Sequence, residues 1–549
     1  MNRRATRIAV AVAVVIAVGG VVWVVRGAPD EGSEGPTPRF VDEASAAGVD
    51  HRYSGEFEHF VGGGVAVLDC DGDALPDLYF AGGAGPAALY RNASEVGGAL
   101  AFERVRDAAT DLDRVTGAYP LDVDADGHTD LVVLRYGENV LLRGSDDCRF
   151  ERANELWNVD GGEEWTTAFS ATWEGDAVLP TMAFGNYLVP DESPSTFDCD
   201  ESVILRPDGE RYGTAHKLGP GYCPLSMLFS DWGRTGRRDL RVSNDRHYAR
   251  DAAEQLWRID PDDAPRLYTE ADGWQTLRIW GMGIASRDLT GDGRPEVYLT
   301  SQGDNKLQTL VDPDAGEPTY TDIALERGVT ATRPYTGEDT DLPSTGWHPE
   351  FGDVNNDGLI DLFVSKGNVE AMADFATTDP SNLFIGQPDG TFVEGAPDAG
   401  ITAIGSARGA ALADLNLDGL LDLVLVNRRE PVQVWRNLGA GTPDAPEPMG
   451  HWLALRLEQD GPNRDAIGAW VEIRAGNQLT QVELIVGGGH VSGQAGWTHI
   501  GLGDSVTAEV TVTWPDGERG EPLQVEADGF AVIERGAGAR SWSAREGDD

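Results

Sequence analysis

The sequence predicts an all-β protein, in which a seven-bladed β-propeller is followed by a small β-sandwich-like domain and preceded by an N-terminal membrane helix. Three observations lead to this fold class. A short acidic loop recurs between apolar runs at an interval of roughly 50 to 65 residues. The length of 549 residues exceeds what one small core can organise. The 69 glycines and 30 prolines favour many turns and short strands over long helices.

Residues 1–27 have the features of a signal anchor or signal peptide. The run from Ile8 to Val25 carries no charge, and as a helix it would be about 27 Å long, close to the thickness of a bilayer's hydrocarbon core. Three arginines precede the run and only Arg26 follows it, which predicts that the bulk of the chain is exported. A cleaved signal peptide is the alternative, although no A-x-A site follows the run. The chain is therefore expected outside the cytoplasm, anchored to the membrane or secreted, and residues 28–38 are expected to be a linker.

The charge balance excludes one class of partner. Lysine and arginine total 43 against 92 for aspartate and glutamate, which gives a formal net charge of -49. A field of this sign repels phosphate backbones and attracts cations. We therefore expect no nucleic-acid partner.

The repeated loop is clearest at residues 353–362, DVNNDGLIDL. The same pattern stands at 69–78, 122–131, 288–297 and 414–423, each time between an apolar run and a second strand-like segment. Two further segments, near Glu174 and Asp231, keep this framework and lose most of the acids. Seven units over residues 39–438 are typical of the blades of a propeller.

A second repeated feature lies between the units, where an aromatic residue precedes a small acidic turn. Examples are FVDEASAAGV at 40–49 and YTDIALERGV at 320–329. One copy precedes the first loop and none follows the last. The strand at Phe40 is therefore expected to complete the sheet of the seventh blade, which leaves no unpaired edge between the first and last blades.

The loop residues predict calcium ligands. Ca²⁺ takes six to eight oxygen ligands, and the side chains at places one, three, five and nine of each loop can supply them. An EF-hand is excluded because the loop closes at place nine and continues as a strand, and Mg²⁺ fits less well because it requires strict octahedral geometry. Solvated turns are the alternative, since Asp, Asn and Gly favour turns anyway, but five copies at one spacing favour a metal role. The expected ligands are Asp69, Asp71, Asp73, Asp77, Asp122, Asp124, Asp126, Asp130, Asp288, Thr290, Asp292, Glu296, Asp353, Asn355, Asp357, Asp361, Asp414, Asn416, Asp418 and Asp422.

Four cysteines suit an exported chain in which disulfides can form. Three pairings are possible. Cys199 and Cys223 bracket a Pro/Gly segment, which favours a bridge between them, with Cys70–Cys148 as the second. No pair has the spacing of a zinc site.

The loops that follow the second strands are expected on the face opposite the metal loops. They carry polar and cationic side chains that would converge there as a site for an anionic or sugar ligand: Asn244, Asp245, Arg246, His247, Lys306, Lys366, Arg428 and Arg429. Ordinary polar loops are the alternative. His247 near Asp245 is the one pair considered for acid–base work, and no G-x-S-x-G or H-E-x-x-H motif is present.

The repeats resemble FG-GAP/VCBS repeats, the calcium-loop blades also found in integrin α chains. The segments HWLALRLEQDGPNRDAIGAWVEIRAG (451–476), GGGHVSGQAGWTHIGLG (487–503) and VTVTWPDG (510–517) resemble the ASPIC/UnbV domain. Together they resemble the cartilage acidic protein family and its bacterial relatives. Residues 451–535 alternate with period two, as expected of a small β domain; 439–450 is expected to be a linker and 536–549 a flexible tail.

Two functions follow as hypotheses. The first is an exported calcium-binding module for interaction or adhesion at the cell surface, with a protein or glycan ligand and with Ca²⁺ stabilising the blades. The resemblance implies this role and implies no established reaction. The alternative is a propeller hydrolase or lyase acting on an extracellular polysaccharide.

Overall fold

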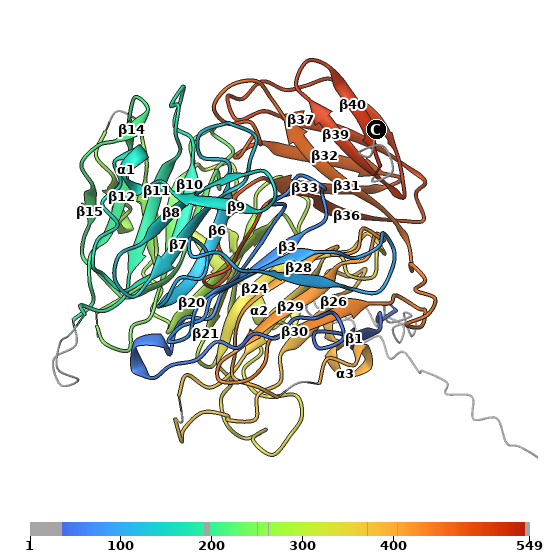
Figure 1. Ribbon diagram of the computed structural model, residues 1–549, viewed down its shortest axis with the longest axis horizontal. Helices are drawn as coiled ribbons and strands as arrows, with labels where there is room; N and C mark the ends of the chain where they lie inside the picture. Colours follow the sequence, from blue (N-terminus) through green and yellow to red (C-terminus); the bar gives the residue numbers. More distant parts are fainter. Residues whose placement is uncertain are drawn as a thin grey trace, which may run out of the picture.

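The computed structural model describes residues 36–190, 198–249, 251–261, 263–370, 372–402 and 404–543. Seven units of four antiparallel strands follow one another around the body of the molecule shown in Figure 1. The first three units are β2 (Val65–Leu68), β3 (Asp77–Phe80), β4 (Ala88–Asn92) and β5 (Phe102–Val105); β6 (Val115–Leu121), β7 (Asp130–Arg135), β8 (Val140–Ser145) and β9 (Arg149–Arg152); and β10 (Thr166–Thr172), β11 (Thr181–Asn186), β12 (Ser202–Leu205) and β15 (His216–Leu218). A small hairpin, β13 (Pro207–Asp208) and β14 (Arg211–Tyr212), extends from the third unit.

The remaining four units have the same order. They are β16 (Pro224–Ser230), β17 (Asp239–Asn244), β18 (Gln255–Arg258) and β19 (Arg266–Leu267); β20 (Gly281–Arg287), β21 (Glu296–Ser301), β22 (Lys306–Leu310) and β23 (Tyr320–Asp322); β24 (Gly346–Gly352), β25 (Asp361–Lys366), β26 (Asn382–Gly386) and β27 (Phe392–Glu394); and β28 (Ala407–Ala413), β29 (Asp422–Asn427), β30 (Gln433–Asn437) and β1 (Phe40–Asp42). The expectation of an all-β, propeller-like fold is confirmed.

The first strands of successive units contact one another in turn, and β28 of the last unit contacts β2 of the first. These strands read as short apolar runs, such as VAVL at 65–68, because both of their faces pack against neighbouring units. The last sheet takes its fourth strand from the other end of the described chain: Phe40 pairs with Asn437 and Asp42 with Trp435. This is the pairing that the sequence predicts for Phe40, and Figure 1 shows β1 beside β30.

The aromatic residues between the units begin several of the outermost strands. Phe102, Tyr320 and Phe392 open β5, β23 and β27. One helical turn follows in several units, as α1 (Asn154–Trp157), α2 (Ala324–Arg327), α3 (Ala396–Ala399) and η2 (Glu270–Asp272), while η1 (Phe57–His59) lies before β2. The three α-helices each end on a left-handed residue, which stops the helix and returns the chain to the next unit.

The C-terminal region forms two four-stranded sheets around one apolar core. One sheet consists of β36 (Thr498–Gly503), β31 (His451–Glu458), β39 (Gly529–Glu534) and β40 (Gly538–Trp542), and the other of β33 (Gln478–Glu483), β32 (Trp470–Ala475), β37 (Thr507–Thr513) and β38 (Leu523–Glu526). The expected tail beginning at residue 536 is corrected here, because β40 pairs with β39 along its length. Beyond it, residues 544–549 lie outside the described residues.

One loop of the C-terminal region enters the centre of the ring. Its short strands β34 (Val486–Gly487) and β35 (Gly493–Gln494) pair with β10 and β16 and with β2. Between them His490 is fully buried, with Nε2 2.7 Å from the carbonyl oxygen of Val61 and Nδ1 3.2 Å from that of Leu225. Residues 486–494, called the axial loop below, therefore join several units at their inner strands.

Both disulfides proposed from the sequence are present, Cys199–Cys223 and Cys70–Cys148. The second links the first unit to the turn between β8 and β9 of the second unit. No helix among the described residues is long and apolar enough to cross a membrane. The membrane segment expected at residues 1–27 lies outside the described residues.

Candidate metal centre

Each acidic loop joins the first and second strands of its unit and is organised by the carboxylate at place one. In the loop from Asp353, Oδ1 accepts the N–H of Asp357 at 3.2 Å and Oδ2 accepts the N–H of Gly358 at 2.7 Å. Place six has φ near +80°, with 83° at Gly358, a conformation in which glycine avoids a steric penalty. The first loop has Ala74 at this place, with φ 68°.

The carboxylate at place nine ties the loop to the third strand. Asp361 Oδ2 accepts the N–H of Val354 at 2.9 Å, and Oδ1 accepts the N–H of Gly386 in β26 at 2.8 Å. Burial, and then the neighbouring carboxylates, raise the pKa of Asp361 well above its usual range. Asp77, Asp130 and Asp422 make the corresponding pairs of bonds in their own units.

The fourth unit separates the residues that build the loop from those that suit a metal. Asp231 still accepts the N–H groups of Thr235 and Gly236, both at 2.7 Å, and Asp239 still accepts an N–H from the end of the third strand. Gly233 and Thr235 fill places three and five. The carboxylates at places one and nine are therefore sufficient to form the turn. The acids or amides that the other loops have at places three and five are not needed for it.

In two of the loops, the side-chain oxygen at place three is buried without a hydrogen-bond partner among the described residues, which indicates a ligand. Asn416 Nδ2 donates to the carbonyl of Gly98 and to Asp418 Oδ2, whereas Oδ1 of the same buried amide has no hydrogen-bond partner among the described residues. In the second unit Asp124 Oδ1 is likewise buried and without such a partner in the described part of the chain. Buried oxygens of this kind are rare in folded proteins and suit coordination of a cation.

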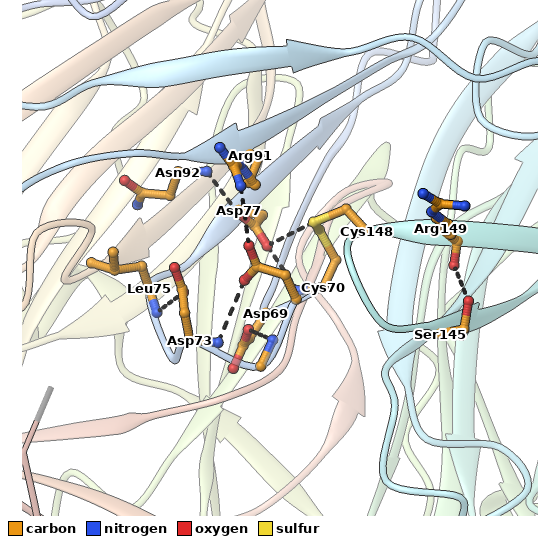
Figure 2. Close-up of a disulfide and its surroundings, with 12 residues drawn as sticks. Asp69, Cys70, Asp73, Leu75, Asp77, Arg91, Asn92, Ser145, Cys148 and Arg149 are labelled. Carbon is orange, nitrogen blue, oxygen red and sulfur yellow. Dashed lines mark hydrogen bonds and ion pairs between the residues drawn. A yellow bond between two sulfur atoms is a disulfide. The ribbon is translucent and has the colours of Figure 1, made fainter. Parts of the chain in front are cut away.

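The carboxylates also gather closely enough for one ion. Single ligand atoms of Asp122, Asp124 and Asp130 lie within 4.8 Å of one another, as do those of Asp69, Asp71 and Asp77. Figure 2 shows Asp69, Asp73 and Asp77 around the first loop, beside the Cys70–Cys148 disulfide. Burial raises the pKa of Asp77 to about 8 and that of Asp122 to about 6, because no positive charge compensates their ionised forms fully. These oxygen donors fit Ca²⁺.

The loop of the fifth unit differs from the other four acidic loops in having Thr290 at place three and a glutamate at place nine. Glu296 at place nine accepts the hydroxyl of Thr309 at 2.7 Å and the N–H of Leu289 at 2.8 Å. Thr290 at place three lies 3.4 Å from the same carboxylate. Asp288, Asp292 and Glu296 are the carboxylates of this loop.

Arginine stands beside three of the loops, a feature that the sequence analysis missed. In the third unit Arg206 binds both oxygens of Glu174, at 2.8 and 2.9 Å. In the fourth unit Arg237 binds Asp239 at 2.8 and 3.2 Å. In the second unit Arg143 contacts Asp124 at 2.7 Å and Asp126 at 2.8 Å. In each of the two units without acidic loops, an arginine thus pairs with a carboxylate of the loop segment.

The C-terminal region covers the metal-loop face of the ring. Gln481 donates to Asp288 Oδ2 at 3.0 Å, and His499 Nε2 lies 2.7 Å from Asn356 Oδ1. A Cβ on Gly419 would lie 2.0 Å from the indole of Trp452, so this glycine also permits close approach of the two regions. Arg456 lies 3.9 Å from Asp69. Figure 1 shows the C-terminal strands above the ring on this side.

The cations expected to gather on the opposite face are paired with acids. Lys366 is fully buried, with Nζ 2.8 Å from Asp379, and Lys306 lies 3.1 Å from Asp322. Arg428 pairs with Glu370, and Arg429 lies 3.1 Å from the same carboxylate. Each of these four side chains therefore has an acidic partner in the described part of the chain.

The other four residues of that expected site lie close together in sequence and in space. Asn244 is buried and donates to the carbonyl of Ala253 at 2.8 Å. Asp245 is buried and accepts a hydrogen bond from the hydroxyl of Tyr187 at 2.6 Å. From His247 it accepts a hydrogen bond through the backbone N–H and not through the ring. Arg246 stacks over Trp280 at 5.3 Å. Among the described residues no hydrogen bond joins the ring of His247 to Asp245, so the pair considered for acid–base work is not assembled.

Comparison with known proteins agrees with these features. The family model described as FG-GAP-like repeat matches residues 69–133, and the model described as ASPIC and UnbV matches residues 459–540. The two matches do not overlap, and each covers only a part of the chain. The FG-GAP-like match contains the first two acidic loops, and the ASPIC and UnbV match contains the axial loop.

Curated relatives match over a smaller part of the chain. Cartilage acidic protein 1 of Mus musculus is 30% identical over 166 residues, covering 29% of this chain and 23% of the relative. The Homo sapiens protein of the same name is 31% identical over 160 residues, covering 28% and 22%. The match thus spans less than a quarter of the length of these relatives.

Solved structures with a similar arrangement are more distant. An Agrocybe aegerita lectin described as recognising non-reducing terminal N-acetylglucosamine is 16% identical, with a TM-score of 0.39, over 68% of this chain and 91% of that chain. AofleA from Arthrobotrys oligospora is 9% identical, with a TM-score of 0.34, over 66% and 90%. At these TM-scores the likeness carries no information about ligands.

Proposed function

We propose that this chain is an exported interaction module built on a seven-bladed propeller that calcium stabilises. The observation that carries the proposal is found in the loops of the second and seventh units, where the place-three oxygens Asp124 Oδ1 and Asn416 Oδ1 are buried and lack a hydrogen-bond partner among the described residues. Asp414, Asn416, Asp418 and Asp422 would hold one ion, and the corresponding four residues of the other acidic loops would hold the rest. Bound Ca²⁺ would supply positive charge to carboxylates that now repel one another.

The stabilising role follows from electrostatics and mass action. Burial raises the pKa of Asp414, Asp418 and Asp422, and neighbouring carboxylates raise those of Asp414 and Asp422 further. An ion that binds only the folded ring favours folding, by about 2.7 kcal/mol per site when it is at a hundred times its Kd. Several such sites within one ring would make the folded state strongly dependent on calcium.

The face opposite the metal loops is the proposed surface for a protein or glycan partner. The C-terminal region covers the metal-loop face through contacts such as those of Gln481 and Arg238. On the opposite face His247 is exposed, and Arg246 stacks on the exposed ring of Trp280. An aromatic ring with an adjacent cation suits stacking and polar contacts with a partner.

The test combines ion binding with thermal unfolding. Terbium luminescence and calorimetric titration should report binding to the full chain, and chelation should lower Tm by roughly 10 °C or more, given several sites. The double variant Asp357→Asn with Asp418→Asn should lose part of this binding, whereas Thr235→Ser, in a loop without an acidic set, should leave it unchanged. A Tm that does not respond to chelation would overturn the proposed role.

A further inference from the structure

One position of the third strand holds an arginine in five of the seven units. In the register of the second and third strands this position lies opposite place nine of the loop, in the strand or directly after it. In the second unit, for example, Leu131 after place nine pairs with Leu142, which puts Arg143 opposite Asp130. The five arginines are Arg91, Arg143, Arg206, Arg258 and Arg436, and the fifth and sixth units have Thr309 and Ile385 instead.

The partners of these arginines differ between the units that have acidic loops. In the seventh unit the guanidinium of Arg436 is 3.1 Å from Glu43, outside the loop. In the first unit Arg91 donates to Glu103 at 2.9 Å and stays 3.9 Å from Asp71, too far for a hydrogen bond. Within the described acidic loops, Arg143 is the arginine of this set that lies within hydrogen-bond distance of the acids at both place three and place five.

Arg143 holds an oxygen that an ion at the second loop needs. Its Nη2 donates to Asp126 Oδ2 at 2.8 Å, while Oδ1 of the same carboxylate accepts the N–H of His128 at 2.9 Å. The place-five carboxylates of the sixth and seventh loops use Oδ1 in the same way, for Leu359 and Leu420. Oδ2 is therefore the oxygen that place five has left for a ligand, and in the second loop the guanidinium has taken it.

The rest of the second loop remains prepared for a cation. Nε of Arg143 donates to Asp124 Oδ2 at 2.7 Å, but Asp124 Oδ1 is buried and has no hydrogen-bond partner in the described part of the chain. This carboxylate also lies close to Asp122 and Asp130, with ligand atoms of the three within 4.8 Å of one another. The second loop thus combines an inward-facing set of oxygens with a guanidinium at its rim.

The contacts of Arg143 are of a kind that a divalent ion can replace. Its side chain is 34% exposed and that of Asp126 is 24% exposed, and ion pairs in such surroundings are weak. Calcium carries twice the charge of a guanidinium and would interact with four carboxylates rather than two. Whatever affinity calcium loses by displacing Arg143, Arg143 loses in the same measure when calcium is bound.

We propose that Arg143 is an internal competitor for the second metal loop, displaced when calcium enters. The second loop then fills at a higher calcium concentration than the sixth loop, where Ile385 stands at the corresponding position and offers no charge. This inference rests on the proposed calcium function and assigns a graded response to it. Arg206 is the permanent form of the same arrangement, because its loop has lost the acidic set and the arginine stays paired with Glu174.

The first test measures calcium binding to the full chain by calorimetric titration. Arg143→Met removes the charge and should tighten one site about tenfold, as expected from the loss of two partly exposed ion pairs that oppose binding. Arg143→Lys should lie between, since an ammonium cannot bridge both carboxylates as a guanidinium does. Arg152→Met, which changes the net charge equally at the exposed pair with Glu138 in the same unit, is the matched control and should bind as the unaltered protein does.

A second background assigns the effect to the second loop. Asp124→Ala removes the place-three ligand, so Arg143→Met should change calcium binding no further when it is combined with this variant. Binding that tightens equally with and without Asp124 would show a general charge effect and would overturn the competitor role.

Thermal unfolding separates competition from a purely structural role. Without calcium Arg143→Met should lower Tm, because Asp124 and Asp126 lose their counter-charge, and in saturating calcium the difference should disappear. An equal loss of Tm under both conditions would show that Arg143 serves the fold and would overturn the proposal. Absence of any calcium binding in the unaltered protein would instead refute the proposed calcium function, whereas binding that Arg143→Met leaves unchanged would refute this inference alone.

Discussion

The guanidinium of Arg206 holds both carboxylate oxygens of Glu174, at 2.8 and 2.9 Å, beside a loop that has lost its acidic set. Both side chains are largely shielded from solvent. The third unit therefore has an internal ion pair where the acidic units have room for calcium. The units of the ring thus differ in what lies beside the carboxylates of the loop segment: in the third unit it is an arginine side chain.

Arg206→Gln should destabilise the protein by about 2 kcal/mol, between the values typical of exposed and buried ion pairs. The loss should be the same in calcium and in chelator, because no ion is involved. Chemical denaturation under both conditions measures it. Arg152→Gln, which breaks the exposed pair with Glu138, is the control and should change little. A loss seen only with calcium would contradict this assignment.

Places five and nine of one loop should respond differently. Asp418→Asn keeps an oxygen for the N–H of Leu420 and loses only the acceptor for the Asn416 amide, which retains its bond to Gly98. It should therefore weaken calcium binding and cost less metal-free stability than Asp422→Asn. Asp422→Asn loses an acceptor for Leu415 or Asn437, so it should cost about 1–3 kcal/mol with or without calcium. Denaturation curves with and without chelator distinguish the two. Identical behaviour of the two variants would refute the division of roles.

Ala74→Gly should stabilise the protein by about 0.5–1 kcal/mol. Ala74 has φ 68° at a place where other loops have glycine, and a left-handed backbone is unfavourable for alanine. Ala66→Gly in the fully buried strand β2 should have the opposite effect. Thermal unfolding of both variants checks this pair of expectations, and a destabilised Ala74→Gly protein would rule out strain at this turn.

The metal-free protein should become less stable as the pH rises from about 4 to 8. The pKa is raised to about 6 for Asp122 and about 8 for Asp77, so the folded state binds protons that the unfolded state has lost in this range. Stability then falls with increasing pH. Calcium should remove much of this dependence, since it stabilises the ionised carboxylates. Denaturation in chelator at a series of pH values gives the slope, and stability that increases over this range would be inconsistent with it.

His490→Ala should lower the stability of the whole chain by about 2–4 kcal/mol, because it opens a space and leaves the carbonyls of Val61 and Leu225 without their partner. The loss should appear in one cooperative transition that includes both regions. His451→Ala, at a partly exposed ring 2.7 Å from Asp528, is the control. Two separate transitions in the unaltered protein would contradict a ring and an axial loop that unfold together.

Local patterns carried most of what the sequence could predict. Five acidic loops with fixed spacing, the Cys199–Cys223 disulfide and the strand at Phe40 were accessible, because each is set by local turn chemistry or by the count of repeats. The Cys70–Cys148 disulfide joins residues 78 apart and followed only as the pairing that remained. The boundary at residue 535 was placed too early, since GARSW at 538–542 has little apolar content yet pairs with β39. Edge strands of this kind take their structure from the partner strand rather than from their own composition.

Contacts between residues far apart in the chain could not be predicted. The packing of the C-terminal region over the metal loops depends on pairs such as Gln481 with Asp288. No motif in either segment predicts this contact. The expectation for Lys366 and Arg428 did not include their acids for the same reason, because Asp379 and Glu370 lie in the loop between β25 and β26, where no local pattern pairs them with these cations. The ion pair between Arg206 and Glu174 could not be predicted from local sequence either, because two strands separate these residues in the chain.

The axial loop has a consequence for how the chain acquires its structure. The inner strand β2 pairs with β35 at Gly493, and Phe40 pairs with Asn437. Segments near the start of the described chain therefore need partners that are synthesised much later before the fold is complete. Such distant pairings give a high contact order and slow folding. A chain that grows from its N-terminus would thus remain unfinished, with its earliest β-structure exposed, until the residues that supply these partners have been added.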